Sequence, residues 1–125
     1  MSPEVQNYLL LASLFFIHYI ADFPLQAEWM AIQKSSSNKA LLAHVSIYSG
    51  ILALWAFGFT DWEPMMCILF ALSNGALHAI IDRQTSKRIG IAYNAGNTRG
   101  VFMWVGLDQM LHHFCLLALP VYMMT

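Results

Sequence analysis

The sequence predicts an all-α protein, an integral membrane four-helix bundle that forms one domain over residues 1–125. Hydrophobic residues make up 58% of the chain and charged residues only 10%, whereas soluble domains carry about 25% charged residues. The apolar residues are concentrated in four stretches, and the basic residues are confined to two of the three connections between them. A chain with so few charges cannot cover its surface with polar groups, so the lipid bilayer is its expected surrounding.

The four apolar stretches each approach the roughly 20 residues that cross a hydrocarbon core about 30 Å thick. Pro3 and Pro64 stand at the start of the first and third stretches, where the first turn of a helix accepts proline. The spans are therefore expected at residues 3–21, 40–59, 64–81 and 101–124.

The distribution of charge predicts the orientation in the membrane. All six basic residues lie in the first connection (33–39) or the third (83–100): Lys34, Lys39, Arg83, Lys87, Arg88 and Arg99. The second connection holds Asp61 and Glu63 and no basic residue. Because cytoplasmic loops are rich in lysine and arginine, the first and third connections are expected in the cytoplasm and both termini outside it. The net charge of −1 does not favour specific nucleic-acid binding.

Each predicted span contains ionisable residues, which are costly at membrane depth and rarely retained without a partner or a role. Three pairs are spaced four residues apart, so that both members lie on one face of a helix; the pairs and one further histidine are His18 and Asp22, His44, His78 and Asp82, and Asp108 and His112. All seven adjoin the first or third connection and should share a band roughly 10–15 Å deep on the cytoplasmic side.

Four imidazoles and three carboxylates are more than one ordinary mononuclear site needs, and they indicate a site for two or more divalent metal ions. Zinc is the first expectation, with manganese and iron as alternatives. A single histidine in a span is more often a hydrogen-bonding link between helices, but seven such residues at one depth favour a metal centre. Gln26 and Gln109 are expected to orient the ligands. His113 points about 100° away from His112 and is expected to support the ligands or to pack.

The same residues carry a resemblance to a known family. The strings HYIADFPLQAEWM (18–30), HAIID (78–82) and DQMLH (108–112), with His44 between them, resemble the HxxxDFxLQ, HxxxD and DQxxH motifs of a family of unknown function among small phage, prophage and bacterial membrane proteins. The pattern is more distantly similar to LexA-regulated inner-membrane metal-dependent hydrolases. Through them it is similar to helical zinc phospholipases C and single-strand nucleases, which cleave phosphodiesters. The resemblance implies a protein of the bacterial inner membrane.

The expected function is metal-dependent hydrolysis of a phosphoester at the cytoplasmic face. Asp22, Asp82 and Asp108 would be catalytic oxygen ligands, one of them bridging two ions and one acting as general base. Cations and amides of the third connection would bind the phosphate of a small molecule or lipid: Arg83, Lys87, Arg88, Asn94, Asn97 and Arg99. Alternatively, these cations only set the topology and meet anionic headgroups.

Two other classes of function remain open at this point. The first is a non-catalytic phage or prophage membrane factor, involved in exclusion or lysis, in which a metal or a polar cluster only joins the helices. The second is a redox or transport protein with haem between histidine pairs, which the three aspartates fit poorly. A second copy of the chain is a further candidate partner, because four short spans make a thin bundle.

Overall fold

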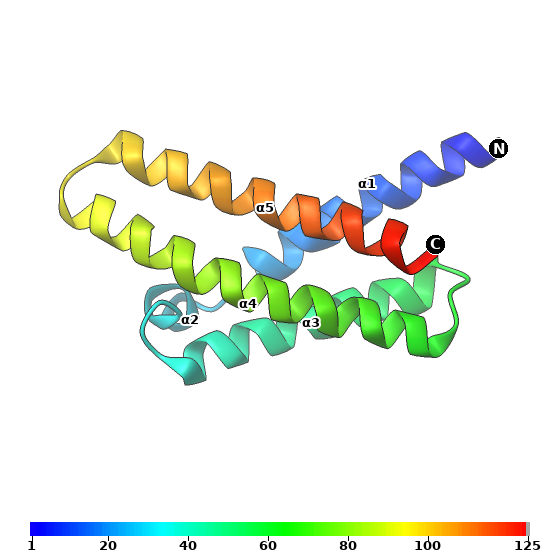
Figure 1. Ribbon diagram of the computed structural model, residues 1–125, viewed down its shortest axis with the longest axis horizontal. Coiled ribbons are helices and arrows are strands. Elements are labelled where there is room, and N and C mark those ends of the chain that lie inside the picture. Colours follow the sequence, from blue (N-terminus) through cyan, green and yellow to red (C-terminus); the bar gives the residue numbers. More distant parts are fainter. Residues whose placement is uncertain (125) are drawn as a thin grey trace.

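The protein is all-helical in a computed structural model that describes residues 1–124, with side chains up to Pro120. These residues form five helices and no strand: α1 (Pro3–Asp22), α2 (Glu28–Gln33), α3 (Asn38–Phe59), α4 (Pro64–Asn94) and α5 (Thr98–Met124) (Figure 1). Four of the helices are long, and α2 is a short helix in the connection between α1 and α3. The predicted all-α class is confirmed.

Local sequence signals account for the helix ends. The hydroxyl of Ser2 accepts a hydrogen bond from the Val5 N–H at the start of α1, and Ser37 does the same for the Ala40 N–H at the start of α3. Each hydroxyl satisfies a backbone donor that the first turn leaves without a partner. The turn after α4 contains Gly96 with a φ of +68°, a left-handed conformation that glycine adopts at no steric cost.

Three of the described helices are long and apolar enough to cross a membrane: α3, α4 and the Thr98–Pro120 part of α5. Large apolar side chains on their outer faces are exposed, among them Leu54 at 70% and Phe102 at 70%. A lipid surrounding would cover these side chains. α1 is not among the three, because polar residues occupy both of its ends, from Glu4 to Asn7 and from His18 to Asp22.

The long helices pack in the order α1, α3, α4 and α5, with α2 against α3. α1 and α3 are joined by a hydrogen bond of 2.9 Å from the Trp55 Nε1–H to the hydroxyl of Ser13. An apolar core that includes Leu52, Phe70 and Leu116 fills the end of the molecule nearest the α3–α4 connection. The predicted metal ligands lie at the other end of this core, toward α2, whose following residue Lys34 contacts Asp82.

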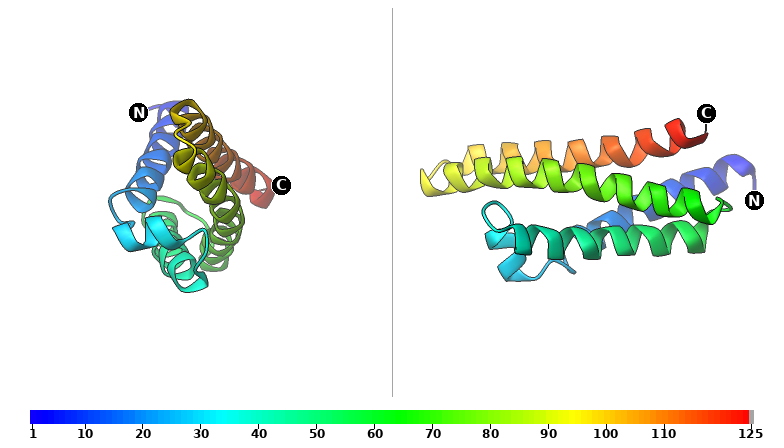
Figure 2. Two further views of the ribbon diagram at one scale, coloured as in Figure 1. Left: turned by 90° about the vertical axis from the view of Figure 1, so that its left-hand side faces the viewer. Right: turned by 60° about the horizontal axis from the view of Figure 1, so that its bottom comes forward.

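The third connection is much shorter than residues 83–100, because α4 continues to Asn94 and α5 begins at Thr98. α4 and α5 therefore extend beyond the start of α3 as a pair of adjacent helices (Figure 2). Residues 83–94 contain arginine, lysine and glutamine, which favour helix. The apolar segment of α4 therefore ends where these polar residues begin, but the helix itself continues through them.

Candidate metal centre

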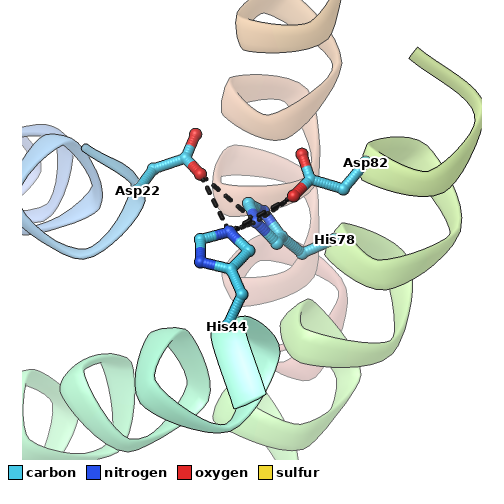
Figure 3. A group of neighbouring side chains, drawn as sticks. All are labelled: Asp22, His44, His78 and Asp82. Carbon is cyan, nitrogen blue, oxygen red and sulfur yellow. Dashed lines mark hydrogen bonds and ion pairs between the residues drawn. The ribbon is translucent and has the colours of Figure 1, made fainter. Parts of the chain in front are cut away.

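Four of the predicted ligands converge on one point between three helices (Figure 3). Asp22 comes from the last turn of α1, His44 from α3, and His78 and Asp82 from α4. All four side chains are buried, with 3% exposure or less. The i, i+4 spacing of His78 and Asp82 places both on the inner face of α4, as the sequence predicted.

Five of the separations between donor atoms in this group lie at or slightly below those between the ligands of a tetrahedral ion. The Nε2 atoms of His44 and His78 lie 3.0 Å apart. Asp22 Oδ1 lies 3.2 Å from the His44 Nε2 and 3.4 Å from the His78 Nε2, and Asp82 Oδ2 lies at the same two distances. Ligands about 2.0–2.2 Å from a tetrahedral zinc ion are separated by about 3.3–3.6 Å. The four donors thus lie close enough together for one ion to contact all of them.

A second group of donors shares Asp22 with the first and adds Asp108 and His112 from α5. The Nε2 of His112 lies 3.3 Å from Asp108 Oδ1 and 3.4 Å from Asp82 Oδ1. This group offers three protein donors, so an ion there would keep a coordination position for water or substrate. Among these residues, Asp22 is the one that belongs to both groups and would be available to both ions.

A contact between His78 and His112 limits how the two groups can be used together. Their Nδ1 atoms lie 3.1 Å apart and their rings stack with centroids 4.0 Å apart. Two N–H groups cannot face each other at that distance, so at most one of the two rings is protonated at Nδ1. A neutral histidine without a proton at Nδ1 carries it at Nε2 and has no lone pair there for a metal. If His78 serves the first group, His112 donates its Nε2–H to the carboxylates of Asp82 and Asp108.

His18 lies beside the first group but is already hydrogen-bonded at both ring nitrogens. The amide nitrogen of Gln109 donates to Asp22 Oδ2 at 2.9 Å and to Asp108 Oδ2 at 3.1 Å, which turns its oxygen toward His18. His18 therefore donates from Nε2 to Gln109 Oε1, and its Nδ1 accepts from the Tyr48 hydroxyl, each at 3.1 Å. The predicted role of Gln109 in orienting the carboxylates agrees with these contacts, whereas the role of His18 as a ligand stays a prediction.

Lys34 is a site residue that the sequence did not single out. Its ammonium lies 2.8 Å from Asp82 Oδ2, the same oxygen that faces the Nε2 atoms of His44 and His78. The carboxylate is 1% exposed and the lysine side chain 12%. Lys34 follows α2, and the fold of the α1–α3 connection brings it back over the cluster. From the sequence, Lys34 is one basic residue in a polar, serine-rich connection. That context indicates on which side of the membrane the connection lies, but not that Lys34 contacts a ligand.

Thr85 and Tyr48 are two further contacts that the motifs did not include. The hydroxyl of Thr85 donates to Asp108 Oδ1, and the hydroxyl of Tyr48 holds His18. Both residues lie near predicted ligands in sequence, since Thr85 is three residues after Asp82 and Tyr48 is four after His44. Residues three or four positions apart lie on the same face of a helix. Polar residues at those positions after each predicted ligand could therefore have been identified from the sequence.

The remaining predicted residues lie at different distances from the cluster. Arg83 adjoins Asp82 in sequence, but its guanidinium donates to Asn38 Oδ1 at 2.7 Å. Arg88 lies over the ring of Trp104, and Lys87 is exposed. Arg99 is in the first turn of α5, nine residues before Asp108, or about 14 Å along the helix. The structure therefore does not bring Arg99, or the neighbouring Asn94 and Asn97, to the cluster.

In the part of the chain that the structure describes, no hydrogen bond or ion pair joins the side chain of Gln26 or His113 to the two donor groups. A buried side-chain oxygen of Gln26 has no hydrogen-bond partner among the described residues. The ring of His113 packs between Phe15 and His18, with centroid separations of 4.8 and 5.1 Å. His113 therefore packs between α1 and α5, in agreement with its predicted packing role.

Comparison with protein-family models matches residues 10–125 to a family described as "Protein of unknown function (DUF3307)". The matched region includes every residue of the two donor groups. Comparisons with curated proteins and with solved structures found no match.

Proposed function

Because the chain belongs to this family of unknown function, its activity has to be inferred from the site, and we propose an integral membrane, metal-dependent hydrolase of a phosphoester. Membership in a family of unknown function was expected from the motifs; the phage or prophage relationship and the likeness to LexA-regulated hydrolases remain predictions. The observation that carries the proposal is the pair of adjoining donor groups that share Asp22. The first group has four donors around one point. The second group has the carboxylates of Asp22 and Asp108, beside which His112 donates its Nε2–H while His78 serves the first group, so coordination positions stay open there.

The chemistry of the donors fits divalent metal ions, with zinc first and manganese or iron as alternatives. Imidazole nitrogen suits zinc and iron, and carboxylate oxygen suits manganese as well. Asp82 Oδ2 receives no hydrogen bond from the described residues, although it is buried and faces two imidazole nitrogens as well as the Lys34 ammonium. The Lys34 ammonium is the cation that faces this oxygen at 2.8 Å, and a metal ion at the centre of the group would take its place. Such ions would lower the pKa of a bound water and polarise a phosphoryl oxygen.

The side chains around the donor groups would hold the reacting partners in place. Asp108 accepts from Gln109 and Thr85, which fix it at the three-donor group as the candidate general base. Lys34 is the cation nearest the first group and would contact a phosphoryl oxygen after leaving Asp82. This assignment transfers the main phosphate-binding role from the predicted third connection to the α1–α3 connection.

The proposed membrane arrangement is a four-helix bundle in the bacterial inner membrane, with α1 as the fourth span. α1 supplies Asp22 to both donor groups, so it must lie at the same depth as the helices that complete them. The basic residues lie in the α1–α3 connection, at the start of α3, on α4 after the cluster, and at the start of α5. The positive-inside rule then places this end of the bundle in the cytoplasm.

Elemental analysis of the detergent-purified protein tests the proposal. We expect one tightly held equivalent of zinc, manganese or iron, and a second that is retained only with excess metal because its protein ligands are the carboxylates of Asp22 and Asp108. The double variant His78→Ala/Asp82→Ala should lose the tight equivalent, whereas His113→Ala, a matched change outside both groups, should keep it. A wild-type protein that takes up no divalent metal when supplied with it would remove the hydrolase proposal.

Replacing Lys34 with alanine should raise the KM for a phosphoester substrate about tenfold, because a charge-assisted contact to phosphate is lost. Metal content should be unchanged or higher, since Lys34 competes with the ion for Asp82 Oδ2. Lys39→Ala, which removes an exposed lysine at the start of α3, is the control and should leave KM unchanged. An unaltered KM in the Lys34 variant would exclude the residue from substrate binding.

A second candidate is a non-catalytic phage or prophage membrane factor with a structural metal. The four-donor group favours it, because structural zinc sites are closed by four protein ligands and all four donors here are buried. This candidate predicts tightly held metal without hydrolysis of any phosphoester, and loss of the folded protein rather than of turnover when the ligands are replaced.

A further inference from the structure

An apolar groove of about 350 Å³ lies on the opposite side of the core from α2. Leucines of α1 and α5 form its walls and two tryptophans contribute to it: Leu10, Leu14, Leu116, Leu117, Trp55 and Trp62. The groove lies where α1 and α5 lack the close backbone packing that joins α1 to α3 and α4 to α5. Its volume is within the range of about 300–1,000 Å³ that is usual for small-molecule sites.

The groove begins next to the metal centre and runs away from it. Leu14 is four residues before His18 on α1, and Leu116 is four residues after His112 on α5. On each helix the groove residue therefore lies one turn, about 6 Å, from a residue of the cluster and on the same face. Asn7 and Pro120 mark the far end of the groove, about 12–16 Å from the cluster along the two helices.

This arrangement matches the polarity of a lipid in a bilayer. The cluster lies near the end of the apolar segment of α4 and the groove lies further along that segment. If α4 spans the bilayer, the cluster is on the side toward the lipid phosphates and the groove is deeper among the hydrocarbon chains. A water-soluble phosphoester would use the donor groups but would leave the groove without an occupant. A lipid would place its phosphate at the donors and a hydrocarbon chain between α1 and α5.

We infer that the substrate is a lipid phosphoester whose hydrocarbon chain lies in this groove; the inference deepens the proposed hydrolase function and rests on it. In the reaction, a water oxygen bonds to phosphorus while the bond from phosphorus to the lipid oxygen breaks. The lipid alcohol takes up the proton that the water releases, so no further reactant is needed. The gap between α1 and α5 lets the lipid enter sideways from the bilayer.

Photolabelling in vesicles tests the position of the chain separately from turnover. The full protein is placed in phosphatidylcholine vesicles with a trace of phosphatidic acid that carries a diazirine at the end of one acyl chain. Labels are expected on Leu10, Leu11 and Leu117, in several-fold excess over labels from a phosphatidylcholine probe with the same acyl chain. Equal labelling of the groove by both probes, or labelling only of outer faces, would overturn the inference.

Activity on two substrates then tests the groove as a determinant of specificity. Leu117→Trp, which fills the groove, should lower kcat/KM for long-chain phosphatidic acid at least about tenfold, because the chain loses buried contact. It should leave kcat/KM for the water-soluble dihexanoyl form unchanged. Leu54→Trp, a matched change on the exposed face of α3, should alter neither value.

The outcomes separate the two proposals. If the wild-type protein binds metal but hydrolyses neither substrate, the hydrolase function is contradicted. The photolabelling of the groove then still shows whether the lipid chain lies between α1 and α5. Hydrolysis of both substrates with equal kcat/KM, unaffected by Leu117→Trp, overturns the lipid inference and leaves the hydrolase function standing. A second copy of the chain covering the groove would appear as a dimer that Leu117→Trp dissociates, and this result would also overturn it.

Discussion

The Asp22→Asn protein is expected to lose both metal equivalents and to hydrolyse the phosphoester at a rate more than about 100-fold below that of the wild type. Asp22 is common to both donor groups, so one substitution removes a charged oxygen from each. Loss of a residue that only orients a ligand typically costs 10–100-fold in metal affinity or activity, and loss of a shared ligand should cost more. Elemental analysis and a phosphate-release assay on the same preparation measure both effects.

The Asp108→Asn protein is the matched comparison, because Asp108 belongs only to the three-donor group. It should retain the tight metal equivalent, lose the weak one, and lose most of its activity. The two variants change the same chemical group, so they separate a shared ligand from an unshared one. If Asp22→Asn keeps both equivalents, or if the two variants have the same metal content, Asp22 does not bridge two ions.

Divalent metal should raise the stability of the wild-type protein strongly. A ligand that binds only the folded state stabilises it by about 4 kcal/mol when its free concentration is 1,000 times the dissociation constant. Without metal, the carboxylates and imidazoles of the cluster are buried, and their contacts with one another replace only part of the hydrogen bonds that water would give them. This loss of hydration lowers the stability of the folded protein. Thermal unfolding in detergent, with added zinc and after chelation, should therefore show a large increase in Tm with metal.

Two controls show whether this increase arises at the cluster. The His78→Ala/Asp82→Ala protein should unfold at the same temperature with and without metal. The His113→Ala protein should respond as the wild type does, because His113 packs between Phe15 and His18 and belongs to neither donor group. A metal-dependent increase in Tm that persists in the double variant would place the bound metal elsewhere.

The spacing of ionisable residues predicted the cluster well, because helix geometry alone relates positions four residues apart. His78 with Asp82, and Asp108 with His112, each present both side chains inward. The shared depth of the pairs followed from their positions next to the connections. These two relations need no knowledge of tertiary packing, so they could be inferred before the helices were placed.

Lys34 and the length of α4 could not be predicted in this way. The contact of Lys34 with Asp82 depends on the path of the connection that contains α2, which no periodicity specifies. The extension of α4 to Asn94 was missed because the loss of apolar residues after Asp82 was interpreted as the end of the helix. Hydropathy reports the surroundings of a helix, whereas its length depends on backbone propensity and on packing against α5.

The modest apolar character of α1 has a consequence for how the protein is made. α1 is synthesised first, before the three more apolar helices that pack beside it or near it. A segment with polar residues at both ends enters a bilayer poorly alone, because each ionisable group must first find a partner. If α1 is the fourth span, as proposed, its stable insertion is expected to wait until α3 and α4 leave the ribosome. Their polar side chains would then receive Asp22 and His18, and insertion would be a late, cooperative event rather than a helix-by-helix one.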